Sequence, residues 1–274
     1  MNFNNIFFIA DADGTLLTDD KRILETDRAA IRELTEHGGL FAIATGRGVA
    51  LARTVWSELF DSGEQGADTP AVIFNGAAVY DFKRECFLWQ STLPEIAKDY
   101  IKRASERFPA LGVEILRGDE IYVTSTNRRE EEHLALGLTE PIRCGFDDVP
   151  PDNWIKTLLV GEPEEIDEAI EFTKTQGFDE VHLVRSAPVF YEMLPKGVNK
   201  GTGFKKLLEI MNLSDKFIIA AGDFMNDLEM LQMADLGIAV ANAEDCVKDT
   251  ADLIVCNNNS GAMHEIIEYL KRVN

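Results

Sequence analysis

The stretch FFIADADGTLLTDD, residues 7–20, is an apolar run that stops on two carboxylates separated by a single alanine. A strand ending at Ala10 leaves Asp11 and Asp13 at its carboxyl edge, followed by a Gly-Thr turn. Open α/β sheets bind their ligands at this edge. The stretch therefore predicts a strand with catalytic or ligand-binding side chains at its carboxyl end. The alternative is an acidic β-turn, which would have a similar composition.

The sequence on either side of this stretch alternates short apolar runs with helix-like segments. IFFIA (6–10) and LFAIA (40–44) are typical of buried strands, and a helix is expected between them, from about residue 26 to 37. A second helix is expected after residue 47. Strands that alternate with helices indicate βαβ units and a parallel sheet.

The last part of the chain repeats this pattern. An apolar stripe over residues 204–211 predicts a helix, and FIIAA (217–221) predicts a strand, followed by a helix from about 226 to 234. Two further strands, GIAV and LIVC, and a closing helix, HEIIEYLKRV, are expected after it. The two ends of the chain therefore predict the halves of one doubly wound α/β core.

The middle of the chain has a different sequence pattern. It contains a polar helix near residues 96–108, the alternating strand EIYVTS and the Glu-rich stretch RREEEH. This pattern predicts a separate α+β module inserted into the α/β core. We expect core segments at residues 1–82 and 188–274, with the inserted domain at residues 83–187.

Composition excludes some partners. The 274 residues contain 48 acidic and 27 basic side chains, a formal charge of −21, which would repel nucleic acid and anionic membrane surfaces. A small anion can still bind where a metal ion or local cations dominate the field. No CxxC pair, signal peptide or membrane-length apolar segment is present, so a cytoplasmic location is expected. The sequence carries no signal for an oligomeric state.

Two further motifs follow predicted strands or precede helices. Thr45 and Gly46 follow LFAIA, where a hydroxyl and bare backbone N–H groups can bind phosphoryl oxygens. Lys200 precedes the helix at 204–211, and a cation there could stabilise charge next to two carboxylates. Taken singly, the first motif is more often a turn and the second a surface lysine.

The fourth motif is GDFMNDLEML, residues 222–231, directly after FIIAA. Its polar residues are Asp223, Asn226 and Asp227. Hard oxygen ligands of this kind suit Mg²⁺, which proteins hold with one or two carboxylates. The alternative is that Asp223 only caps the following helix.

The remaining candidate side chains are expected to lie outside the site. The four histidines lack HExxH spacing and are expected to be structural or surface residues: His37, His133, His182 and His264. Arg117 and Arg185 are expected to be solvated charges.

The motifs DxDGT, TGR, a lysine before a helix and GDxxND occur in this order, and the chain thereby resembles the haloacid dehalogenase-like superfamily of phosphohydrolases. The inserted module is similar to the C2-type cap of Cof-like sugar phosphatases, and VIFNGAAVYD (72–81) is similar to a segment of that group. One departure is Ala12, where many relatives carry a larger apolar residue.

This resemblance implies roles for the residues around the metal. Asp11 is the nucleophile that becomes an aspartyl phosphate, and Asp13 is the general acid and then the general base. Mg²⁺ is expected to bind the carboxylates of Asp11 and Asp223 and the backbone carbonyl of Asp13. The presence of Asp13 favours phosphate ester hydrolysis, because dehalogenases lack this second acid and the transport ATPases carry lysine there.

The resemblance also implies a phosphate site. Thr45, Gly46 and Lys200 are expected to cradle the phosphoryl group, together with Asn226 on the substrate side. Asp227 is expected to orient the metal shell or the lysine.

The leading hypothesis is a Mg²⁺-dependent phosphatase for a small phosphorylated metabolite such as a sugar phosphate. A phosphomutase is the nearest rival, because it would return the phosphoryl group to the substrate instead of giving it to water. A non-catalytic binding module is a rival of another class. We expect the inserted cap to close over the site and select the leaving group.

Overall fold

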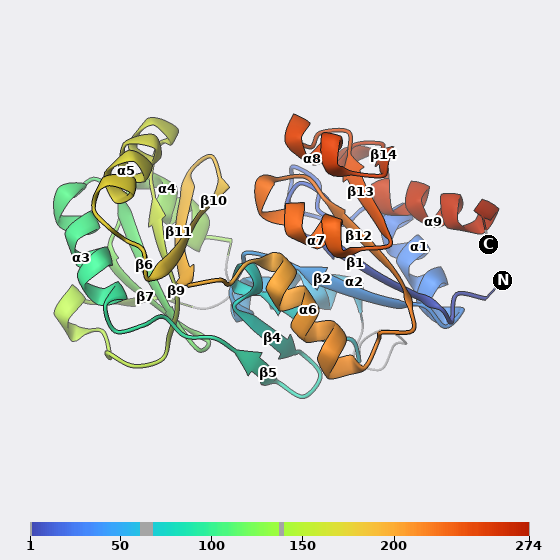
Figure 1. Cartoon of the computed structure of the whole chain (residues 1–274), viewed down its shortest axis with the longest axis horizontal. Coiled ribbons are helices and arrows are strands. Elements are labelled where there is room, and N and C mark those ends of the chain that lie inside the picture. Colours follow the sequence, from blue (N-terminus) through green and yellow to red (C-terminus); the bar gives the residue numbers. More distant parts are fainter. Residues whose placement is uncertain (1, 61–67, 137–139, 274) are drawn as a thin grey trace.

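The computed structural model of the chain describes residues 2–60, 68–136 and 140–273. It contains two α/β units that lie side by side (Figure 1). Within these ranges, no helix is both long and apolar enough to cross a membrane.

The core unit is built on a sheet of eight described strands in the order β14-β13-β12-β1-β2-β3-β4-β5. The strands from β14 to β3 pair in parallel, and β4 and β5 extend the edge as antiparallel strands. The predicted parallel core is confirmed. The strand bounds are β1 Ile6–Asp11, β2 Leu40–Ala44, β3 Ala71–Ile73, β4 Ala78–Asp81, β5 Cys86–Gln90, β12 Phe217–Gly222, β13 Leu236–Val240 and β14 Leu253–Val255.

Helices cover both faces of this sheet, as expected for a doubly wound fold (Figure 1). On one face α1 (Glu25–Glu36) packs against α9 (Ala262–Val273), and on the other α6 (Lys200–Met211) packs against α7 (Leu228–Met233). Every residue of β1 is buried, which explains the uninterrupted apolar run of residues 6–10 before Asp11. The other core helices are α2 (Val49–Leu59), α8 (Asp245–Thr250) and the 3₁₀ turns η1 (Phe74–Gly76), η3 (Met225–Asp227) and η4 (Asn258–Ser260).

The second unit has a sheet of six described strands in the order β10-β11-β9-β6-β7-β8, antiparallel except for the β7–β8 pair. Helices α3 (Ala97–Arg107) and α5 (Pro163–Thr175) lie on its side remote from the core (Figure 1). The other elements are β6 Gly112–Arg117, β7 Glu120–Ser125, α4 Arg128–Leu134, β8 Ile142–Arg143, η2 Phe146–Asp148, β9 Trp154–Val160, β10 Val181–Ala187 and β11 Phe190–Pro195.

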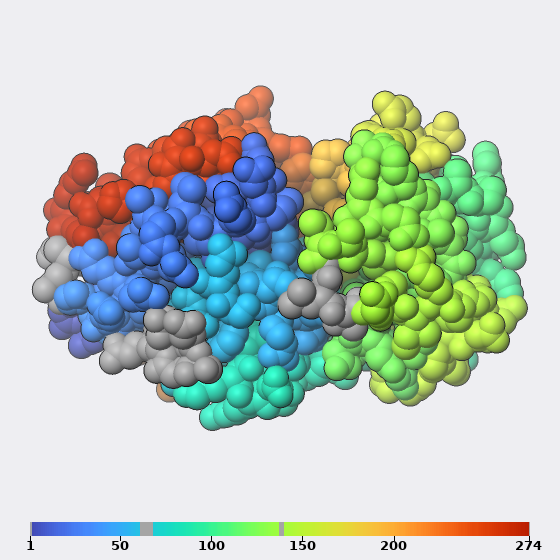
Figure 2. Space-filling view, turned by 180° about the vertical axis from the view of Figure 1, so that it is seen from behind, coloured from blue at the N-terminus to red at the C-terminus, as the bar shows by residue number. Residues whose placement is uncertain are grey.

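Strand pairing places the limits of this second unit later than 83 and 187. Residues 86–90 form β5, which pairs with β4 in the core sheet, and residues 190–195 form β11, which pairs with β9 and β10. Composition does not reveal which ladder an edge strand joins, so the sequence pattern alone could not assign these two strands to a unit. We propose that residues 91–195 form the cap module and that the rest is core. Figure 2 shows the blue and red chain ends together in one lobe, with the green and yellow segment in the other.

The register of the core sheet brings three motifs to one edge. Asp11 pairs with Ala44 of β2, and Ala10 pairs with Ala221 of β12. The residues that follow these strands therefore emerge side by side at the carboxyl edge.

Candidate active site

A buried lysine lies between two carboxylates at this edge. Asp11 ends β1, and Lys200 is the first residue of α6. The Lys200 Nζ donates to Oδ1 of Asp11 and, at 2.5 Å, to Oδ1 of Asp227. Asn199 caps α6 by accepting the Thr202 N–H at 2.9 Å, which fixes where the helix begins and where Lys200 points. Burial alone would lower the pKa of Lys200, but the two carboxylates outweigh it and raise the pKa.

The loop after β12 adds a third carboxylate. Oδ1 of Asp223 accepts from the Thr15 hydroxyl at 2.9 Å. Oδ2 of Asp227 accepts the backbone N–H groups of Asp223 and Phe224 at 3.0 and 3.1 Å. Asp227, rather than Asp223, therefore stabilises the turn that begins η3, and Asp223 is left facing Asp11.

These carboxylates fit a divalent cation. Asp11, Asp223 and Asp227 each place one oxygen within 4.8 Å of the others. Oδ2 of Asp11 is buried and has no hydrogen-bond donor among the residues described. Burial and the nearby charge of Asp227 raise the pKa of Asp223 to about 7, and the Thr15 hydroxyl and the Lys200 ammonium offset only part of this increase. Since Asp227 is already engaged by Lys200 and two N–H groups, Asp11 and Asp223 have the oxygens that could hold a divalent cation here.

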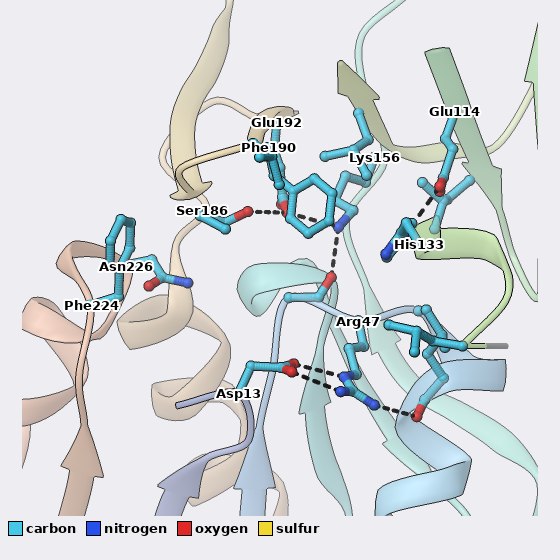
Figure 3. Close-up of a pocket in the computed structure, with 18 of the residues that line it drawn as sticks. Asp13, Arg47, Glu114, His133, Lys156, Ser186, Phe190, Glu192, Phe224 and Asn226 are labelled. Atoms are coloured by element: carbon cyan, nitrogen blue, oxygen red, sulfur yellow. Dashed lines mark hydrogen bonds and ion pairs between the residues drawn. The ribbon is translucent and has the colours of Figure 1, made fainter. Parts of the chain in front are cut away.

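Asp13 is held by two cations. Arg47 donates to both carboxylate oxygens at 2.7 Å, through Nε and Nη2 (Figure 3). Lys21 donates to Oδ1 at 2.8 Å. Burial alone would raise the pKa of Asp13, but Arg47 and Lys21 outweigh it and hold the pKa far below its usual range. Asp13 is therefore a carboxylate in this structure.

The other predicted site residues lie close by, in different settings. Thr45 is buried, and its hydroxyl accepts the Arg47 N–H at 3.1 Å. The carbonyl of Gly46 accepts from Lys156 at 2.6 Å. Asn226 donates to Oδ1 of Asn75 at 2.8 Å, while its own Oδ1 is buried without a partner in the described part of the chain.

A cavity of about 290 Å³ separates this edge from the cap module. Among the predicted site residues, Asp11, Asp13, Gly46, Asp223 and Asn226 line it. Thr45 and Lys200 are not part of the lining and lie buried beneath it. The opposite wall comes from the cap and includes Glu114, His133, Lys156, Ser186, Phe190 and Glu192 (Figure 3).

Four residues of this region did not stand out in the sequence. Arg47 belongs to the TGR motif, so its position next to Thr45 and Gly46 was an available signal. Asn75 lies in VIFNGAAVYD (72–81), the segment similar to the Cof-like group, but was not singled out, and Lys156 and Glu192 carried no signal. Asn75 adopts a left-handed backbone conformation in η1 (φ 52°), and Glu192 accepts from its Nδ2 at 2.5 Å.

One histidine lies at the cavity, which the sequence did not indicate, and the two arginines are partly buried in ion pairs rather than free solvated charges. His133 lines the cavity, because α4 turns its last residues toward the core. Arg117 pairs with Glu120 and Asp152, and Arg185 pairs with Asp167. Neither arginine lines this cavity.

Comparison with known proteins agrees with this geometry. Two Bacillus subtilis proteins, both named 5-amino-6-(5-phospho-D-ribitylamino)uracil phosphatase, are 28% and 26% identical to the chain over 265 and 263 residues. These matches cover 94% of this chain and 94% and 93% of the relatives. A crystal structure from Thermotoga maritima is 28% identical with a TM-score of 0.80, covering 98% of this chain and 97% of the other.

The family assignment follows from a match over almost the whole chain. The sequence model described as haloacid dehalogenase-like hydrolase matches residues 8–267, a span that includes both core segments and the cap. With this match and its phosphatase relatives, the chain belongs to the haloacid dehalogenase-like hydrolase family and is an enzyme of its phosphatase type.

Proposed function

We propose that this protein is a Mg²⁺-dependent phosphatase that hydrolyses a small phosphorylated metabolite, a sugar or sugar-alcohol phosphate, through an aspartyl phosphate on Asp11. The observation that carries this proposal is the unpartnered Oδ2 of Asp11, which is buried beside Lys200 and within reach of Asp223. The name of the two B. subtilis relatives, which describes a phosphate ester of a ribityl chain, supports the substrate class.

In the first half of the reaction, Asp11 Oδ2 attacks phosphorus and the ester P–O bond breaks. The leaving oxygen takes a proton from Asp13. Asp13 is ionised in this structure and both of its oxygens accept from Arg47, so Asp13 must first take up a proton from solvent as Arg47 turns aside. The fork of Arg47 matches the oxygens of a phosphoryl group.

In the second half, water attacks phosphorus, gives its proton to Asp13 and releases inorganic phosphate and the Asp11 carboxylate. The Lys200 ammonium remains beside Asp11 throughout, and its charge stabilises the equatorial oxygens. Asp11 and Asp223, with the backbone carbonyl of Asp13, would hold Mg²⁺. The bound ion would supply charge neutralisation at the phosphoryl oxygens.

The first experiment is phosphate release from a panel of sugar and sugar-alcohol phosphates with Mg²⁺. We predict that Asp11→Asn lowers kcat by a factor on the order of 10⁴ while the circular dichroism spectrum stays that of the wild type. Substantial turnover by this variant would refute the nucleophile assignment. Isomer formation without phosphate release would favour a phosphomutase instead.

Asp13→Asn provides a second arm of this experiment. The leaving group of p-nitrophenyl phosphate needs no proton, so this variant can still transfer the phosphoryl group to Asp11. It lacks the general base that activates water, so it cannot hydrolyse the aspartyl phosphate. A hydroxylamine-sensitive phosphate should therefore accumulate on the protein. Its absence would contradict a covalent intermediate on a carboxylate.

A further inference from the structure

His133 presents a nitrogen atom to the cavity from the cap side. Its Nε2 lies 3.3 Å from Oε1 of Glu114. Figure 3 shows the other ring nitrogen facing the cavity interior. No residue in the described ranges makes a hydrogen bond to this Nδ1 atom, so it is available to a ligand.

A pair of buried carboxyl groups lies behind the histidine. Glu130 and Glu114 are almost fully buried and in contact with each other. Both oxygens of Glu130 lack a donor among the residues described. Burial and then the charge of Glu114 raise the pKa of Glu130 to about 10, so Glu130 carries a proton that it can donate to Glu114. Gly112 makes room for this pair, because a Cβ there would lie 2.8 Å from the Cβ of Glu130.

The arrangement fixes the tautomer of His133. Burial lowers the pKa of His133, which keeps the ring neutral at pH 7. A neutral ring has one donor and one acceptor nitrogen. Oε1 of Glu114 has no hydrogen-bond partner among the residues described, so the 3.3 Å contact acts through charge: a carboxylate there favours a hydrogen on Nε2 over a lone pair, and Nδ1 is left as the acceptor. The edge-to-face contact with Phe190, at 4.8 Å between ring centroids, also limits rotation of the ring.

The cavity around this acceptor has a largely apolar cap wall. Its apolar members include Leu116, Ile121, Leu136, Leu158 and Phe190. A site that hydrogen-bonds a ligand group in such surroundings discriminates against analogues that lack the group, since its own polar atom is then left unpaired.

We propose that Nδ1 of His133 accepts a hydrogen bond from a hydroxyl or amide N–H on the leaving group of the substrate, with Glu114 and Glu130 as positioning residues. This inference rests on the proposed phosphatase function and narrows it. The substrate class is a phosphate ester whose alcohol part carries a hydrogen-bond donor directed at the cap.

The test compares two substitutions of His133, each of which retains a polar group in place of only one of the two ring nitrogens. His133→Gln keeps a donor toward Glu114 but has no atom at the Nδ1 position, whereas His133→Asn keeps a polar atom near Nδ1. His182→Gln is the matched control, because His182 lies on β10 of the same cap and does not line the cavity. The substrates are hexose 6-phosphates, their monodeoxy analogues and p-nitrophenyl phosphate, whose leaving group has no donor.

We expect the wild type and His182→Gln to prefer one hydroxylated ester over its deoxy analogue by about tenfold in kcat/KM, the effect of one hydrogen bond. His133→Gln should abolish this preference, mainly through KM, and His133→Asn should retain part of it. A preference that survives in His133→Gln, or that is absent from the wild type across the series, would overturn the inference.

Nitrogen-15 NMR of the histidine ring supplies a readout that does not depend on turnover. At pH 7.5 we expect the Nε2–H tautomer for His133 and a change of its shifts in Glu114→Gln. An Nδ1–H tautomer would overturn the inference even if the enzyme is active. Absence of phosphate release from every ester by the wild type would instead refute the phosphatase proposal, and the NMR result would still decide the geometry.

Discussion

At the scale of single residues, the site has more negative charge than its own cation can balance. Lys200 is the buried cation between Asp11 and Asp227, and Asp223 adds a third carboxylate within the same few ångströms. A phosphate ester would be repelled by this excess. A divalent ion held by Asp11 and Asp223 would neutralise this excess charge and remove the repulsion. The acidic residues of the site therefore match the proposed Mg²⁺ cofactor.

We predict that Asp223→Ala weakens Mg²⁺ binding and slows turnover together. The substitution removes one of the two side-chain ligands and leaves the Thr15 hydroxyl without its acceptor. The Mg²⁺ concentration at half-maximal rate should rise at least about tenfold, and kcat should fall about 10²-fold. Calorimetric titration with Mg²⁺ alone checks the binding separately. Unchanged Mg²⁺ affinity would remove Asp223 from the ligand set.

Glu130 gives a prediction about stability and pH. Its folded-state pKa of about 10 lies above the ordinary value of 4.5, so the folded protein keeps a proton that the unfolded chain loses. The stability that this proton provides is complete below about pH 4.5 and is lost as the pH rises toward 10. The slope reaches about 1.4 kcal/mol per pH unit for one proton.

Glu130→Gln should remove this dependence, because its amide can donate to Glu114 without titrating. Urea denaturation at pH 6 and pH 9 measures the difference between the variant and the wild type. We expect the variant to gain stability over the wild type as the pH rises. Parallel pH profiles for the two proteins would mean that Glu130 is ionised in the folded state.

At the scale of elements, the position of Lys200 depends on how closely α6 approaches the turn η1. A Cβ on Gly203 would lie 2.5 Å from the Cα of Gly76, and a Cβ on Gly76 would lie 1.9 Å from the carbonyl oxygen of Asn199. Gly76 also has a φ of 94°, which favours glycine. The two glycines therefore allow the contact that sets the start of α6 against the core.

We predict that Gly203→Ala destabilises the protein by about 2 kcal/mol and lowers kcat, since the helix must move and carry Lys200 with it. Lys205→Ala, on the exposed face of the same helix, is the matched control and should change stability by less than about 0.5 kcal/mol. Thermal unfolding and phosphate release measure both effects. Equal behaviour of the two variants would show that the contact is easily relaxed.

The sequence predicted core elements where periodicity was strong. The strands at 6–10, 40–44 and 217–221 and the main core helices appear within a few residues of their expected positions. The edge strand β5, the short helix α8 and the strand β11 were assigned differently or not at all. Their placement depends on which neighbours they pair with, and a local pattern contains no information about a distant partner.

At the scale of the whole molecule, a buried polar network joins the cap to the core. Glu192 on β11 accepts from Ser186 at 2.6 Å and from Asn75 at 2.5 Å, and it forms an ion pair with Lys156 at 3.1 Å. Lys156 also donates to the carbonyl of Gly46 (Figure 3). The loop that carries the TGR motif is therefore tied directly to the cap sheet.

This network shows why only part of the site could be predicted from the sequence. Asp11, Asp13, Asp223 and Lys200 lie in short motifs next to strand ends or helix starts, where local sequence determines position. Residues such as Lys156 and Glu192 are single charged letters within strands. They meet because β11 pairs with β9 in the cap sheet, and they reach Gly46 and Asn75 only because the cap lies over the core edge. No local spacing encodes either contact.

The network leads to a prediction about cap closure. Lys156→Met removes the donor to Gly46 and leaves the charge of Glu192 buried without its cation, a change that typically costs about 3 kcal/mol. We expect the cap to open more often, with faster limited proteolysis in the linking segments 91–96 and 196–199 and a lower kcat/KM. Lys174→Met is the control, since Lys174 forms only an exposed ion pair on α5.

The double variant Lys156→Met with Glu192→Gln separates the network from simple loss of packing. Glu192→Gln removes the buried charge that the lysine substitution exposes, so the two changes together should cost less than the sum of the single changes, by about 1 kcal/mol or more. Proteolysis of the double variant should accordingly be slower than the single effects predict. Additive effects, or a Lys156→Met protein cleaved no faster than Lys174→Met, would show that the cap is held to the core by other contacts and that Lys156 serves the cavity alone.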